Sequence, residues 1–137
     1  MDTQAAGYRE VEHTADWELR VWAPDLGGLL EQAAQGMYTL AGAHLKDGPR
    51  VARKLELPLR DPESLLVKFL TELLYYGEQE GLAFDQFELS LEGDLLHARL
   101  GGAPLARLNK EIKAVTYHNL AVVKTERGLE ASIVFDV

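Results

Sequence analysis

Cysteine is absent from this 137-residue chain. Disulfide bonds, thiolate metal sites and thiol redox chemistry are therefore excluded. The chain has no stretch of the roughly 20 apolar residues that a membrane helix needs, and its first residues lack the basic and apolar parts of a secretion signal. We therefore expect a soluble, cytoplasmic protein that makes no contact with a membrane.

Basic residues are also scarce. Fourteen lysines and arginines stand against 22 acidic residues, which gives a formal net charge of -8. The densest basic stretch, Arg50, Arg53 and Lys54, is short. A phosphate backbone would be repelled by such a surface. The composition predicts no direct binding of nucleic acid and favours a basic protein or a cation as the partner.

The common catalytic motifs are missing as well. The sequence has no serine in a G-x-S-x-G or S-x-x-K setting, no Walker A motif, no dinucleotide fingerprint and no H-E-x-x-H motif. Its four histidines are scattered along the chain. These enzyme classes therefore find no support in the sequence.

The length and the 47% hydrophobic content fit a single domain over residues 1–137. Helical spacing of apolar residues predicts two helices, at 26–40 and from 62 to near Gly77, with Asp25 and Asp61 as N-caps. Alternation of polar and apolar residues predicts strands at 17–22, 51–59, 87–91, 96–100, 112–124 and 129–137, with a break or a bulge at Asn119. This order indicates an α+β fold in which two helices pack on one side of a mixed or antiparallel sheet layer.

Two short clusters combine residues that carry chemistry. Glu12 to Asp16 (E-H-T-A-D) lies just ahead of a predicted strand, where Asp16 or Thr14 could simply satisfy backbone groups. In Lys113 to His118 (K-A-V-T-Y-H), alternation places Lys113, Val115 and Tyr117 on one face and Ala114, Thr116 and His118 on the other. A solvated lysine and a half-buried histidine are the ordinary interpretations of that pattern.

The third feature is the end of the sequence. Asp136 and Val137 follow directly from an alternating strand, with Asp136 opposite the core-directed Ile133 and Phe135. Since most domains end in a few disordered residues, this pattern suggests that the terminal carboxylate is held in place. The alternative is a strand that merely ends, with Asp136 in water.

Taken together, these segments resemble the archease family. The resemblance rests on E-H-T-A-D-W-E at 12–18, the helix D-P-E-S-L-L-V-K-F-L-T-E-L-L-Y at 61–75, K-A-V-T-Y-H at 113–118 and V-F-D-V at 134–137. It implies an archease-like, chaperone-like α/β sandwich. It also implies a non-catalytic activator of an RtcB-type RNA ligase in tRNA splicing and RNA repair, which promotes guanylylation of the ligase histidine by GTP and repeated turnover.

The resemblance further implies a divalent-cation site, with calcium expected first and magnesium as the alternative. Its ligands would be Asp16, Asp136 and Val137, where valine replaces the more common isoleucine and still offers oxygen atoms. Such hard oxygen donors suit these ions. Two carboxylates about 4 Å apart repel by about 4 kcal/mol at an effective dielectric near 20, so a third needs a cation or a proton. Three further residues match functional or motif positions of the family: Lys113, His118 and His13.

Two other functions remain open at this point. One is a metal-dependent hydrolase in which Asp16 and Asp136 hold the ion and His118 acts as the base. The other is a holdase-type chaperone module without a redox switch. Turnover in the absence of a partner would indicate the hydrolase, and suppression of aggregation at stoichiometric dose would indicate the chaperone.

Overall fold

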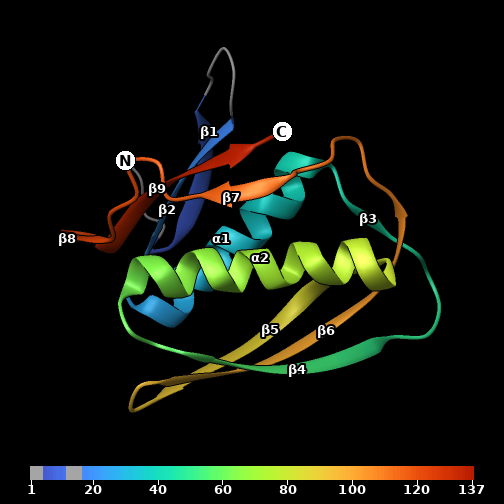
Figure 1. Cartoon of the computed structure of the whole chain (residues 1–137), viewed down its shortest axis with the longest axis horizontal. Coiled ribbons are helices and arrows are strands. Elements are labelled where there is room, and N and C mark those ends of the chain that lie inside the picture. Colours follow the sequence, from blue (N-terminus) through green and yellow to red (C-terminus); the bar gives the residue numbers. More distant parts are fainter. Residues whose placement is uncertain (1–4, 12–16) are drawn as a thin grey trace.

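In a computed structural model, which describes residues 5–11 and 17–137, two antiparallel sheets enclose a layer of two helices (Figure 1). The α+β class is therefore confirmed. The predicted single sheet layer divides into two sheets, and each helix contacts strands of both. Because both sheets cover the helices, the helices can be apolar on more than one side. Within the described residues, no helix is long and apolar enough to cross a membrane.

The first sheet contains described residues of three segments that carry the family resemblance, at 12–18, 113–118 and 134–137. Its inner face packs against the helices through Leu19, Val21, Ile133 and Phe135, which are all almost fully buried. Its outer face carries polar side chains such as Arg20 and Ser132, as alternation predicts. The strands run in the order β1 (Gly7–Val11), β2 (Trp17–Ala23), β9 (Gly128–Asp136) and β7 (Ala114–Thr116), with β8 (Val123–Thr125) also paired to β9.

The second sheet is built on the long strand β6. The strands predicted at 87–91 and 96–100 pair as a hairpin, with Gly93 in its turn at a φ of 61°. Both of its strands are longer than predicted, because glycines 101 and 102 let β6 continue past Leu100. Any side chain at position 102 would collide with the Ala83 carbonyl of β5. The strands are β3 (His44–Leu45), β4 (Val51–Pro58), β5 (Leu82–Glu92) and β6 (Leu95–Arg107).

The helices α1 (Leu26–Ala41) and α2 (Pro62–Glu80) begin at the predicted caps. The Asp25 carboxylate accepts a hydrogen bond from the Gly28 N–H at 2.8 Å, and α1 ends at the left-handed Gly42. The predicted end of α2 near Gly77 is wrong, since the helix runs on to Glu80. A glycine ends a helix only where it turns left-handed, and good helix formers follow Gly77.

The predicted β-rich run at 112–124 is two short strands rather than one. β7 covers Ala114–Thr116 and β8 covers Val123–Thr125, and the break falls around Asn119, which has a φ of 52°. The connection between them is tied to α2, because the Val122 N–H donates to the Glu63 carboxylate at 2.7 Å. Of the two alternatives predicted at Asn119, a break or a bulge, the structure shows the break.

The cap of α2 makes a pH-dependent contribution to stability. The Ser64 N–H and hydroxyl donate to the Asp61 carboxylate at 2.7 and 2.9 Å, and these bonds lower the pKa of Asp61 below its ordinary value of 3.8. A depressed pKa means that the stabilisation is complete above the unfolded value and is lost as the pH falls through the folded value. We expect NMR titration to find this pKa below 3.8, and Ser64→Ala to raise it.

The matched control is Asp61→Asn, because asparagine caps a helix about as well as aspartate does. This variant should keep the helix and lose its share of the acid sensitivity in urea unfolding. A pKa of Asp61 that does not move in Ser64→Ala would contradict the assignment of these bonds.

Candidate functional site

Two of the three sequence clusters meet at the end of β9. The Lys113 N–H donates to the Asp136 carbonyl at 2.8 Å, and the next residue, Ala114, pairs with Asp136 across the ladder. Asp136 and Val137 are the last two residues of the chain. His13 and Asp16 lie outside the described residues, so the predictions made for them stay predictions.

β2 brings a third segment to the same place. Its first residue, Trp17, pairs with Phe135, the residue that precedes Asp136. In the sequence, Trp17 directly follows Asp16. We call the group of Trp17, Lys113, Asp136 and Val137 the β9 corner. Figure 1 shows β7 and β9 side by side and antiparallel, so that β7 begins where β9 ends.

The fold fixes how Asp136 is presented. Phe135 is fully buried, so the alternation of the strand turns the Asp136 carboxylate outward, where it is exposed. Val137 is half-buried and packs against the core. The predicted orientation of Asp136, opposite Ile133 and Phe135, is confirmed. An exposed carboxylate next to anchored backbone can bind a ligand without rearrangement of the core.

Two lysines border the corner. Lys113 is exposed, and the Lys110 ammonium lies 5.6 Å from the centroid of the Trp17 ring. A cation over an aromatic face is attracted by the ring electrons. Sequence reasoning did not single out Lys110, because its contact with Trp17 spans most of the chain and no local pattern reveals it. Among the described residues, the exposed Asp136 side-chain carboxylate of the corner thus has two positive side chains in its surroundings, Lys113 within the corner and Lys110 beside it.

His118 lies at the other end of β7. Thr116 pairs with Val134, and its hydroxyl donates to the Val134 carbonyl at 2.9 Å and accepts from the His118 N–H at 3.3 Å. The His118 ring is exposed and lies 3.3 Å from the Asn119 side-chain amide. The structure therefore brings Lys113, Asp136 and Val137 together and places His118 apart from them.

The donors at the corner can be tested against the predicted cation. Among the described residues, no group of three or more acidic or histidine side chains could hold a metal. Oxygen atoms of Asp136 and Val137 are hard donors of the kind that calcium and magnesium prefer, and the Asp136 carbonyl is already used by Lys113. A cation there would take the Asp136 carboxylate and Val137, and it would need Asp16 and water to complete its shell. The donor chemistry fits.

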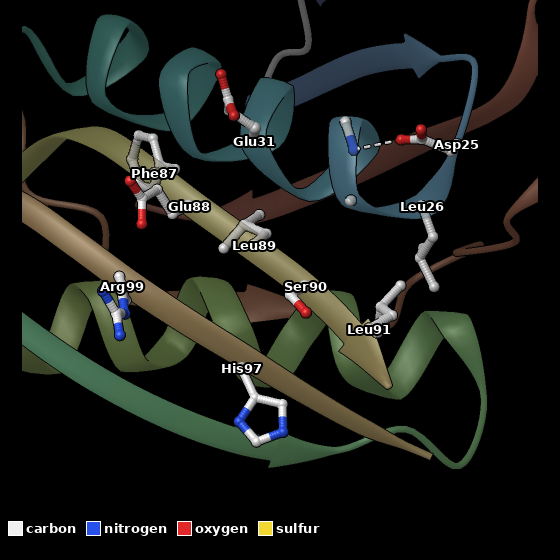
Figure 2. Close-up of a pocket in the computed structure, with 12 residues that line it drawn as sticks. Asp25, Leu26, Glu31, Phe87, Glu88, Leu89, Ser90, Leu91, His97 and Arg99 are labelled. Carbon is white, nitrogen blue, oxygen red and sulfur yellow. Dashed lines mark hydrogen bonds between the residues drawn. The ribbon is translucent and has the colours of Figure 1, made fainter. Parts of the chain in front are cut away.

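A separate groove of about 720 Å³ lies between the start of α1 and β5 (Figure 2). Leu26, Leu89 and Leu91 form its apolar wall. The negative Glu88 and the positive Arg99 also line it, and they are paired across the neighbouring strands β5 and β6. No described residue of the β9 corner lines it. Such compensated charges are typical of the solvated face of a sheet.

His97 has an acidic neighbour. Its Nδ1 lies 2.8 Å from the Glu56 carboxylate on the outer face of the second sheet, and both side chains are partly exposed. The two residues sit opposite each other in the ladder of β4 and β6. This is a cross-strand pair on a solvated surface, where such contacts contribute little.

Comparison with known proteins identifies one family over nearly the whole chain. Residues 8–137 match the Archease protein family. The "Protein archease" of Methanosarcina barkeri is 32% identical with all of both chains covered, and that of Thermococcus gammatolerans is 33% identical over 88% of this chain and 91% of its own.

Two solved structures share the fold. The crystal structure of a Thermotoga maritima archease, described as a possible chaperone, is 24% identical with a TM-score of 0.71, covering 94% of this chain and 96% of that one. The solution structure of Methanobacterium thermoautotrophicum protein 1598 is 24% identical with a TM-score of 0.73, covering 96% and 99%. On the full-length match to the family and to its curated members, this chain belongs to the archease family.

Proposed function

We propose that this chain is a non-catalytic activator of an RtcB-type RNA ligase in tRNA splicing and RNA repair. It promotes guanylylation of the ligase histidine by GTP and supports repeated turnover. Membership of the archease family supports the proposal. The observation that carries it is the β9 corner, where strand pairing gathers Trp17, Lys113 and Asp136 from three distant segments.

The corner supplies groups that suit a nucleotide and metal site. The exposed Asp136 carboxylate and the oxygen atoms of Val137 bind calcium, or magnesium in its place, together with Asp16. A bound divalent cation supplies positive charge for the phosphates of GTP. The Lys113 ammonium, a compact point charge on a flexible stem, binds phosphate oxygens beside it. None of these groups forms or breaks a covalent bond.

The net charge fits a protein partner of opposite sign. With a formal charge of -8, the chain is attracted to the basic surface of an RNA-binding ligase. Electrostatic attraction of this kind raises the rate of encounter and weakens as salt is added. We therefore propose docking of the β9 corner near the nucleotide site of the ligase, without direct contact between the chain and RNA.

The test is a guanylylation assay with labelled GTP, a purified RtcB-type ligase and this chain. We expect the chain to raise the rate of ligase guanylylation by at least about tenfold, equivalent to about 1.4 kcal/mol in the barrier. The ligase alone and the heat-denatured chain are the controls. An unchanged rate at a large excess of folded chain contradicts the proposal. Hydrolysis of phosphoesters by the chain alone would instead support the hydrolase.

A further inference from the structure

A cleft beside the β9 corner has no role in the proposed function so far. It has a volume of about 340 Å³ and lies between α1, α2 and the connection that follows β6. Its floor is almost completely buried, whereas Leu108 at its edge is 44% exposed. Its apolar lining includes Met37, Ala41, Leu73, Leu74, Leu108 and Ile112.

The shape of the cleft is set by the folded backbone. The N–H groups of Asn109 and Lys110 both donate to the Ala41 carbonyl at 3.0 Å, which fastens the connection to the end of α1. Gly42 allows this close approach, because a side chain there would collide with Asn109. The cleft is therefore preformed, and an occupant would not have to order its walls.

The rim of the cleft is charged. Glu78 and Glu111 are both exposed, and neither forms an ion pair with another residue in the described part of the chain. Of the described residues that line the cleft, Lys113 is the single one with a positive side chain. The Tyr38 ring also lines the cleft, and its phenol is neutral at neutral pH because its ordinary pKa lies well above that pH and burial raises that pKa further. An apolar side chain with a positively charged neighbour is complementary to such a site.

The cleft is continuous with the proposed working site. Lys113 lines the cleft, and its N–H is bonded to the Asp136 carbonyl. A partner that covers the β9 corner therefore reaches the cleft as well. The volume is at the low end for a small-molecule pocket, and it is sufficient for one large side chain. Interfaces draw most of their affinity from a few such anchors in preformed pockets.

We propose that this cleft is the anchoring pocket for the ligase, and that it receives a large apolar side chain of the ligase flanked by a lysine or arginine. This inference rests on the proposed function and assigns binding and stimulation of the ligase to two different sites. The cleft provides affinity, and the β9 corner provides stimulation. The two sites are consequently separable by mutation.

The experiment compares binding with stimulation. Leu108→Ser removes the exposed apolar edge, and Glu111→Lys reverses one rim charge; both side chains are exposed, so the fold should tolerate the changes. We expect each to weaken binding to the ligase by about tenfold or more in calorimetry, and to raise the half-maximal concentration for guanylylation equally. The maximal rate at saturation should be unchanged.

Matched controls lie elsewhere on the surface. Leu91→Ser changes a leucine that is 36% exposed in the groove of Figure 2, and Glu126→Lys reverses an exposed charge. Both should bind the ligase normally. Equal effects of the cleft variants and their controls, or none at all, would overturn the cleft assignment. So would a dimer of the chain alone that is lost in Leu108→Ser, because the cleft would then hold a second copy.

The same experiment distinguishes failure of the proposed activator role from failure of the proposed anchoring pocket. If the chain binds the ligase through the cleft and yet does not stimulate guanylylation, the anchoring pocket stands and the activator role is wrong. If stimulation occurs with Leu108→Ser at the wild-type half-maximal concentration, the activator role stands and the anchoring pocket is wrong.

Discussion

Asp136→Asn is expected to raise the dissociation constant for calcium by about tenfold or more, which corresponds to at least about 1.4 kcal/mol. Asparagine keeps the size and one carbonyl oxygen of the side chain, and it removes the negative charge. Calcium affinity depends on the number of charged ligands, so this loss weakens binding even if the geometry persists. Because Asp136 is exposed, the substitution should leave the stability of the fold nearly unchanged.

Calorimetric titration with calcium measures the first effect, and the guanylylation assay measures its consequence. We expect maximal stimulation of the ligase to fall in parallel with metal affinity. Asp47→Asn is the matched control, since Asp47 is exposed in the loop after β3 and the substitution removes the same charge from the surface. If both variants bind calcium with the wild-type affinity, Asp136 is not a ligand.

Phe135→Ala is expected to lower the free energy of unfolding by about 3–5 kcal/mol. Phe135 is 0% exposed and belongs to the largest fully buried side chains of the core. Its removal leaves a cavity between the first sheet and the helices, in addition to the lost transfer free energy. Since the total stability of a typical domain is only about 5–15 kcal/mol, a large fraction would be lost.

Phe135 also lies directly beside the β9 corner. Phe135 lies between Trp17 of β2 and Val115 of β7 in the sheet, directly before Asp136. We expect urea unfolding to show the loss of stability. Tyr117→Ala, at a side chain that is 55% exposed, should change stability by less than about 0.5 kcal/mol. A loss of similar size in both variants would contradict the assigned role of Phe135.

Much of the fold follows from local pattern. Asp25 and Asp61 were predictable as helix caps because a cap depends on neighbouring residues alone. The end of α2 was not, since Gly77 stays helical and Gly81 makes the turn. The division of the strands into two sheets also escaped prediction, because pairing between β2 and β9 joins opposite ends of the chain and leaves no local trace.

The candidate site was likewise predictable from the sequence only in part. The outward direction of Asp136 was predictable from strand alternation around Phe135. The hydrogen bond of Lys113 to Asp136 was not predicted, since neither residue's surroundings in sequence point to the other. Alternation failed past Thr116, where the strand ends, and so it did not show that His118 lies away from the corner.

The proposed activation of the ligase depends most on a divalent cation at the β9 corner. NMR titration of the labelled protein with calcium tests it directly, because amide signals near the bound ion shift first and saturate. We predict saturable shifts centred on Trp17, Lys113, Asp136 and Val137. Shifts centred instead on the groove around Glu88 and Arg99, or shifts that never saturate, would contradict it.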